Sequence, residues 1–97
     1  ESNSALLGNW LSDPADKLTM DNIGQVLISF NDEGVLNYTI LGEDKDEVII
    51  LIYEIHKDKI ITCQPSHPKK EESRYYLDGK ILKLEFDGVL YQFVKME

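Results

Sequence analysis

The sequence predicts an all-β domain in which eight short strands form an antiparallel up-and-down meander that closes into a small barrel. Three observations support this fold class. Short apolar segments recur along the chain and are separated by tight turns, several of which carry Gly or Pro. Strands that flank consecutive turns keep their apolar side chains on one shared face, as expected for a sheet with one buried side. Closure into a barrel would also remove the exposed edge strands that an open meander leaves.

The first strand is expected over Ala5–Leu11, where Gly8 allows a close approach of other groups and Trp10 anchors the core. The segment that follows, 12–22, is polar and rich in turn residues, so we expect a loop. Asp13-Pro14 could instead open one helical turn, because proline suits the first position of a helix.

A hairpin is expected next, because apolar residues alternate in 25–30 and again after Gly34. A three-residue loop, Asp32–Gly34, brings both apolar faces to the same side, whereas a four-residue loop would mismatch them. Such a loop is a type I turn closed by Gly34 in the left-handed region. The predicted cross-strand pairs are Phe30 with Leu36, Ile28 with Tyr38, and Val26 with Ile40.

The strongest predicted strand is Val48–Ile55, which is dominated by β-branched residues and follows an acidic hairpin tip, 42–47. Its odd positions stay apolar to the end and are assigned to the inner face, as Ile49, Leu51, Tyr53 and Ile55. Its even positions begin with a second apolar stripe, made of Val48, Ile50 and Ile52. A contiguous exposed apolar patch is unusual on a soluble monomer, so segment 12–22 or a second chain should cover this stripe. Because that segment is polar, we favour a homodimer.

The next hairpin has no glycine to set its register. A three-residue loop, Lys57–Lys59, would pair Ile55 with Ile61 and would turn Cys63 inward beside Tyr53. The segment that follows, 65–72, contains two prolines, which cannot continue a ladder of hydrogen bonds, so we expect a polar loop.

Two Asp-Gly turns organise the end of the chain. Asp78-Gly79 and Asp87-Gly88 are both suited to type I′ turns, whose two central residues need positive φ. A two-residue loop fixes the register of its hairpin. The predicted pairs are Tyr75 with Leu82, Tyr76 with Ile81, Phe86 with Val89, Leu84 with Tyr91, and Leu82 with Phe93. Both hairpins therefore place their apolar residues on the same face of the meander.

The length and composition limit the classes of function and partner. The 97 residues are one domain, 1–97, in which residues 1–4 are expected to be a disordered leader left after removal of a signal or anchor. The net charge of −8 disfavours nucleic acid and anionic membranes as partners. No apolar segment approaches the ~20 residues that a membrane-spanning helix needs, so we expect no membrane insertion by this chain.

No residues suggest a reaction, a metal site or a cofactor. The two histidines, His56 and His67, are not placed to activate Cys63, since the predicted register puts His56 outside and Cys63 inside. Four converging zinc ligands are not evident, and the acidic tip 42–47 lacks the spacing of a calcium-binding loop. We therefore expect a non-enzymatic protein with no catalytic residue, no metal and no cofactor.

A resemblance to a known family supports the predicted barrel. Gly8-Asn9-Trp10 resembles the Gly-x-Trp signature of the lipocalins and the wider calycin group, and the hairpin rhythm is similar to that of small bacterial lipocalin-like domains. The resemblance implies an eight-stranded barrel, an extracytoplasmic location and, in some members, an apolar small molecule inside. It also implies a basic residue of the last strand across the tryptophan, for which Lys95 is the candidate. The chain departs from full lipocalins in being shorter and in lacking their disulfide.

Two functions follow from these observations. The first is a module that binds a small apolar ligand among the inward aromatic residues, which are Trp10, Tyr38, Tyr53, Tyr75, Tyr91 and Phe93. The second is a protein-interaction or structural module, such as an inhibitor or accessory domain, in which those aromatic residues fill the barrel and leave no room for a ligand. An eight-stranded barrel is compatible with both, because its interior is just wide enough for side chains or for one small ligand.

Overall fold

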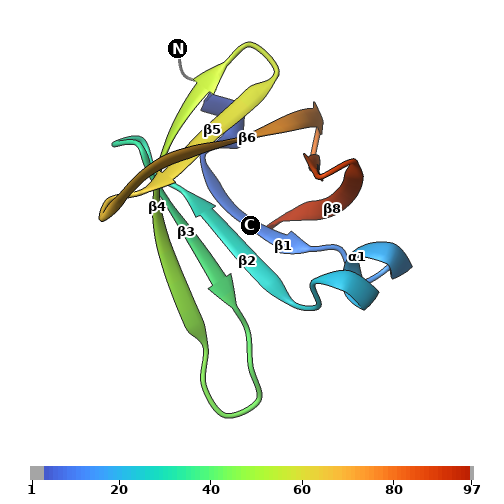
Figure 1. Ribbon diagram of the computed structural model, residues 1–97. Coiled ribbons are helices and arrows are strands. Elements are labelled where there is room, and N and C mark those ends of the chain that lie inside the picture. Colours follow the sequence, from blue (N-terminus) through green and yellow to red (C-terminus); the bar gives the residue numbers. More distant parts are fainter. Residues whose placement is uncertain (1–3, 97) are drawn as a thin grey trace.

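The computed structural model describes residues 4–96, and Figure 1 shows strands that curl around a common interior. The strands are β1 Gly8–Ser12, β2 Val26–Phe30, β3 Val35–Ile40, β4 Glu47–His56, β5 Lys59–Gln64, β6 His67–Asp78, β7 Ile81–Phe86 and β8 Val89–Met96. A short 3₁₀ helix, Ser4–Leu6, precedes β1, and the helix α1, Lys17–Asn22, lies between β1 and β2. Of the predicted leader, residues 1–3 lie outside the described residues, and Ser4 begins the 3₁₀ helix.

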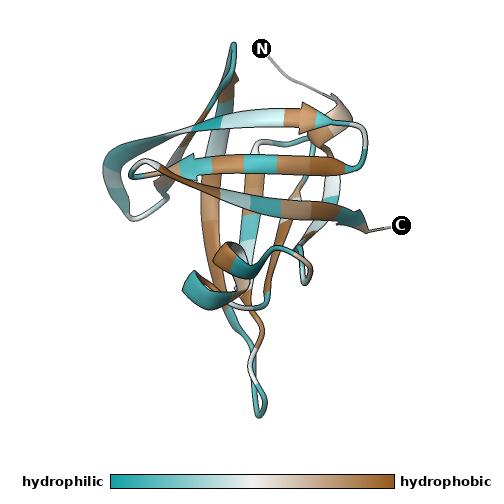
Figure 2. Cartoon of the chain, turned by 90° about the vertical axis from the view of Figure 1, so that its right-hand side faces the viewer, coloured by the Kyte–Doolittle hydropathy of each residue, from teal (hydrophilic) through white to brown (hydrophobic). Residues whose placement is uncertain are grey.

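The strands form one closed antiparallel barrel, which confirms the predicted fold class. Each strand pairs with the next along the chain, and β8 pairs with β1 to complete the ring. At the closing seam Trp10 lies opposite Lys95, and Ser12 lies opposite Phe93. In Figure 2 the hydropathy alternates along the visible strands, as expected when one side chain in two points into the barrel.

Two of the predicted hairpin registers are confirmed. The β2–β3 pairs are those predicted, and Gly34 closes the loop with a φ of 85°. The β7–β8 pairs also agree, and both turn residues, Asp87 at 50° and Gly88 at 79°, have the positive φ that a type I′ turn requires. At these two hairpins the turn residues alone were enough to predict the register.

The β6–β7 register differs from the prediction by two residues. Asp78 pairs with Ile81, so the loop is Gly79-Lys80 rather than Asp78-Gly79. Gly79, with a φ of 60°, takes the first central position, as in a type II′ turn. Because the shift is even, each side chain keeps its predicted face, and Tyr75 now lies opposite Leu84.

The predicted β4–β5 register was wrong by one residue. Only Lys57-Asp58 separates the paired ends of the strands, and Lys57 adopts a φ of 58°, which is uncommon for a residue other than glycine. A shift of one residue turns a strand over. Ile60 therefore faces the core, whereas Ile61 and Cys63, both predicted to lie inside, belong to the outer face.

The predicted polar loop 65–72 was also wrong, because most of this segment is strand. Only Pro65-Ser66 forms the turn, and β6 begins at His67. Between the pairs Thr62–Glu71 and Gln64–His67, β6 contains three residues against one on β5, so the ladder is interrupted there. Pro68 lies in this bulge, where a missing N–H breaks no regular pair.

The segment 12–22, predicted to be a loop, contains the six-residue helix α1, and β1 begins at Gly8 rather than Ala5. Hydrogen bonds fasten this segment to β8. Gln92 Nε2 donates to Asp13 Oδ2 at 2.7 Å, and the Gln92 backbone N–H donates to Thr19 Oγ1 at 2.9 Å. The segment therefore closes one end of the barrel beside β8 and does not reach β4, on the opposite side of the ring.

The core is tightest around Trp10, which is fully buried together with Phe93 and Leu82. The indole Nε1 donates a hydrogen bond to the Leu6 carbonyl at 2.8 Å. Lys95 Nζ lies 4.7 Å from the centre of the indole ring, in the place that the resemblance implied for a basic residue. Its ammonium group also donates to the Leu7 carbonyl.

Candidate ligand site in the barrel interior

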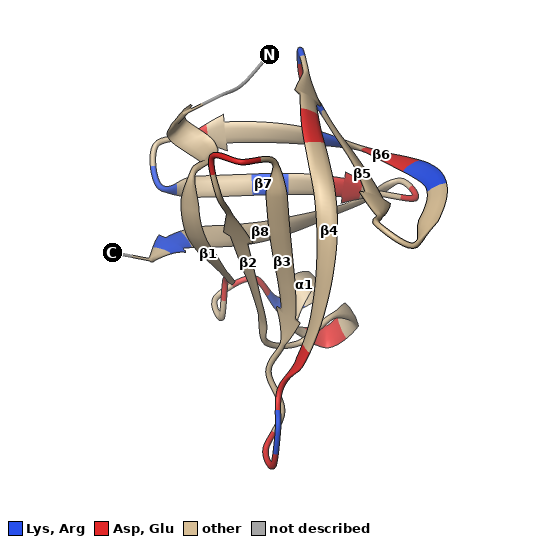
Figure 3. Cartoon of the chain, turned by 90° about the vertical axis from the view of Figure 1, so that its left-hand side faces the viewer, with Lys and Arg blue, Asp and Glu red and all other residues tan. Residues whose placement is uncertain are grey.

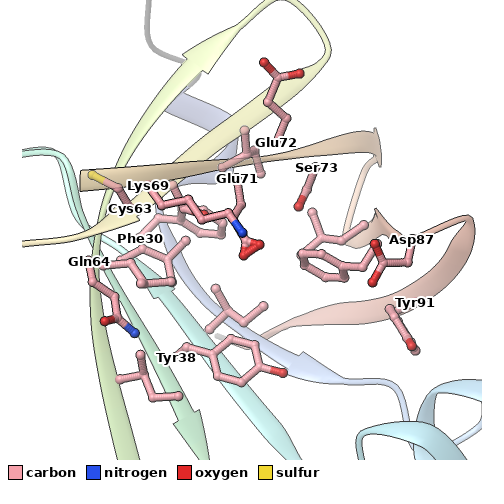
Figure 4. A pocket seen from close by; sticks show the side chains of 18 of the residues that line it. Phe30, Tyr38, Cys63, Gln64, Lys69, Glu71, Glu72, Ser73, Asp87 and Tyr91 are labelled. Atoms are coloured by element: carbon pink, nitrogen blue, oxygen red, sulfur yellow. The ribbon is translucent and has the colours of Figure 1, made fainter. Parts of the chain in front are cut away.

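The barrel is hollow away from the tryptophan core. A cavity of about 640 Å³ is bordered by strands β2 to β8, and Figure 4 shows its lining. Its apolar wall includes Ile28, Phe30, Leu36, Leu51, Ile60 and Leu84. The inward residues of the middle strands are medium-sized, and Leu51 and Thr62 are only half-buried. The two largest fully buried side chains, Trp10 and Phe93, lie on adjacent strands, and neither lines the hollow.

Two tyrosines give the apolar cavity polar groups. Tyr38 on β3 and Tyr91 on β8 both line it, and Figure 4 shows both side chains along the lower part of the cavity. Burial raises the pKa of Tyr38 above 10.0, and the neighbouring Tyr91 adds to the increase. Among residues 4–96 neither hydroxyl has a hydrogen-bond partner within the protein. Both can therefore donate to, or accept from, a molecule in the cavity.

A polar rim borders the cavity along β6 and the β7–β8 turn. Lys69, Glu71 and Asp87 contribute charged side chains to the lining, and Figure 4 labels all three. Glu72 also contributes, but its carboxylate lies 3.4 Å from Lys59 Nζ and is thereby partly neutralised. With Glu71 and Asp87 set against Lys69, the rim is net negative.

Four of the six aromatic residues predicted to bind a ligand lie outside the cavity lining. Trp10 and Phe93 are fully buried in the core. Tyr53 packs edge-on against Phe30, with ring centres 5.2 Å apart, and its hydroxyl donates to the Asn31 carbonyl at 2.5 Å. The Tyr75 hydroxyl donates to the Lys57 carbonyl at 3.2 Å. Tyr53 and Tyr75 thus fasten the β2–β3 and β4–β5 turns.

The rim residues Lys69 and Glu71 were missed in the sequence because their segment was predicted to be a loop. The sequence nevertheless contained a pattern that could have placed these two residues on a strand. Lys69, Glu71 and Ser73 precede Tyr75 at steps of two, which places all four on one face of a continuous strand. The prolines at 65 and 68 obscured this continuity, since proline within a run normally argues against a strand.

The described residues do not form a metal-binding or Cys–His cluster. Within residues 4–96, no three His, Cys, Asp or Glu side chains gather as metal ligands would. His56 and Cys63 both belong to the outer face, since His56 pairs with Lys59 and Cys63 pairs with Ile52. Four residues of strand, about 13 Å, separate their positions. The two side chains are therefore not in contact, although the predicted inward orientation of Cys63 was wrong.

In the described part of the chain, the helices fall short of the length and hydropathy needed to span a membrane. Comparisons with protein-family models, with curated proteins and with solved structures gave no significant match. The closed eight-stranded barrel is consistent with a lipocalin-like fold.

Proposed function

We propose that this protein is a non-enzymatic, lipocalin-like module that holds one small, largely apolar molecule inside its barrel. The observation that carries this proposal is the hollow part of the interior. Its volume of about 640 Å³ lies within the roughly 300–1,000 Å³ typical of small-molecule sites. Its walls are mainly aliphatic and aromatic, and burial of apolar ligand surface against such walls is the main source of affinity.

The polar groups narrow the class of ligand. The unpartnered hydroxyls of Tyr38 and Tyr91 favour a ligand with one or two hydrogen-bonding groups within its apolar body. At the opening, Glu71 and Asp87 outnumber Lys69, so a neutral or cationic head group is favoured over a carboxylate. The proposed ligand is therefore an amphipathic molecule with a neutral or amine head.

Thermal unfolding with a ligand panel tests the proposal. Dodecanol, dodecylamine and dodecanoate share an apolar tail and differ in the charge of the head group. A ligand at 100 times its Kd stabilises the folded state by about 2.7 kcal/mol, and we expect the alcohol and the amine to raise the midpoint more than the carboxylate.

A cavity-filling variant tests where the ligand binds. Leu51→Trp places a large side chain into the hollow and should abolish the shift, whereas Ile61→Trp, on the outer face of the adjacent strand, should preserve it. If no member of the panel shifts the midpoint of the parent protein, or if Leu51→Trp binds as well as the parent, ligand binding inside the barrel is rejected.

The alternative function is an interaction module, and a separate observation favours it. Large aliphatic side chains remain exposed on the outer face of β4. An interaction surface on the outside of a barrel does not require the interior to be filled, so the two functions are compatible in one molecule.

A further inference from the structure

The outer face of β4 carries an exposed aliphatic stripe at the place predicted from the sequence. Val48, Ile50 and Ile52 are 54%, 55% and 43% exposed. Their neighbours on the same face are Val35, which pairs with Ile52 from β3, and Cys63, which pairs with it from β5. Val35 and Cys63 therefore widen the stripe at Ile52, whereas the uncharged polar residues Asn37 and Thr39 of β3 lie opposite Ile50 and Val48.

Over five strands this surface carries no charged residue until the β4–β5 hairpin end, where Glu54 lies opposite Ile61. The outward positions from β1 to β5, outside the β4–β5 hairpin end, are Asn9, Leu11, Leu27, Ser29, Val35, Asn37, Thr39, Val48, Ile50, Ile52 and Cys63. At the chain's average of 29% charged residues, about three of these eleven positions would carry a charge. Figure 3 shows the contrast: β1, β2 and β3 are free of charged residues, β4 carries them towards its two ends, and β6 and β7 carry them along their length. Depletion of charge around an apolar centre is typical of a protein interface.

The segment 12–22 does not cover this surface in the described chain. The segment 12–22 was the intrachain alternative, and its helix α1 packs beside β8, across the ring from β4. We infer that a second copy of this chain covers the outer face of β3–β5, forming a face-to-face dimer. An uncharged surface suits a partner of the same net charge, −8, because the like charges of the two copies then stay outside the contact.

Charge at the two ends of β4 selects the arrangement of the copies. The hairpin tip 42–47 contains Glu43, Asp44, Asp46 and Glu47 against Lys45 alone, whereas the turn after β4, Lys57-Asp58, carries one charge of each sign. If the two-fold axis ran along β4, both acidic tips would meet. If the axis crosses β4 at Ile50, the strands run antiparallel and each acidic tip lies over the partner's turn. The second arrangement is therefore favoured, because it keeps the two acidic tips apart.

The size of the face indicates how tight the dimer is. The three strands β3–β5, spaced about 4.8 Å apart, over about five residues of about 3.3 Å each, present roughly 240 Å² in projection. Two such faces contribute roughly 480 Å², well below the roughly 1,200–2,000 Å² of standard complexes, although the tip and turn add to the rim. We therefore expect a weak dimer with a Kd of about 10–100 µM.

Sedimentation velocity over a range of concentrations tests the inference. From about 5 to about 500 µM, the parent protein should pass from monomer to dimer. Ile50→Lys should weaken the dimer by at least thirtyfold, since it buries an unpaired charge at the centre of the contact. Leu90→Lys is the matched control, because Leu90 is an aliphatic residue, 40% exposed, on the outer face of β8. It should leave the Kd unchanged within about twofold.

Further variants control for misfolding and test the antiparallel arrangement of the two copies. Far-ultraviolet circular dichroism shows whether Ile50→Lys folds, and if it does not, Ile50→Thr, which keeps a β-branched side chain, replaces it and should weaken the dimer about tenfold. Lys57→Glu should weaken association, and Glu47→Lys combined with Lys57→Glu should restore it.

The inference is overturned if the parent protein is monomeric at about 500 µM. It is also overturned if a folded Ile50 variant associates as the parent does, or if Leu90→Lys disrupts the dimer equally. A double variant that fails to recover association overturns the antiparallel arrangement.

Discussion

Replacing Trp10 with alanine removes the largest side chain from the most tightly packed part of the barrel. The residue is fully buried, with Phe93 and Leu82 equally buried nearby. A large aromatic residue buries about 150–250 Å², and at about 25 cal/mol per Å² this corresponds to about 4–6 kcal/mol as an upper estimate. The indole also donates to the Leu6 carbonyl at 2.8 Å, and the loss of this bond leaves a buried acceptor unpaired.

Measured changes from a large aromatic residue to alanine in protein cores cost about 3–5 kcal/mol, and we expect the Trp10→Ala variant to fall in this range. A domain of this size has a total stability of about 5–15 kcal/mol, so the variant should keep a folded state only in mild conditions. Trp10→Phe should cost less, because it retains an aromatic ring and loses mainly the hydrogen bond and part of the packing.

Urea unfolding followed by far-ultraviolet circular dichroism measures both variants, since the chain has no other tryptophan to report by fluorescence. In the parent protein, the native emission of Trp10 should be blue-shifted relative to the unfolded state. A loss of less than about 1 kcal/mol for Trp10→Ala, or a native emission spectrum like that of free tryptophan, would refute the assignment of this residue as the anchor of the core.

Two further predictions concern backbone strain and ionisation. Gly8 has a φ of 113°, a backbone conformation that residues with a side chain rarely adopt, so Gly8→Ala should lower the unfolding free energy by about 1–3 kcal/mol in urea titrations; an unchanged midpoint would contradict this. Burial raises the pKa of Tyr38 above its ordinary value of 10.0. The protonated hydroxyl therefore stabilises the fold fully below about pH 10, and this stabilisation is lost as the pH rises through the folded-state pKa. Stability should therefore fall above pH 10, and Tyr38→Phe should reduce that fall; identical profiles for the two proteins would show that Tyr38 does not contribute.

The fold class and much of the register were determined by the sequence alone, because they depend on local chemistry. Gly34 and the Asp87-Gly88 pair adopt the positive φ that their turns require, and alternation then assigns each flanking side chain to a face. The Val48–Ile52 stripe also followed from alternation, since the apolar even positions of β4 remain exposed where they were predicted to point outward.

The tertiary structure decided the features whose local signal was weak or pointed the wrong way. Lys57 takes a positive φ without being glycine, so the β4–β5 turn could not be recognised, and a one-residue error reversed the face of Cys63. Pro68 argued against a strand that the barrel accommodates through a bulge, and this hid Lys69 and Glu71 from the candidate site.

The position of the cavity was decided by tertiary packing as well. All six predicted aromatic residues point inward by alternation, but alternation gives no position along the barrel axis. Closure of β8 onto β1 sets Trp10 beside Lys95 in the core and leaves Tyr38 and Tyr91 facing the hollow. Which aromatic residues fill the barrel and which border its cavity depends on the stagger of strands distant in sequence, because that stagger sets the depth of each side chain in the closed ring.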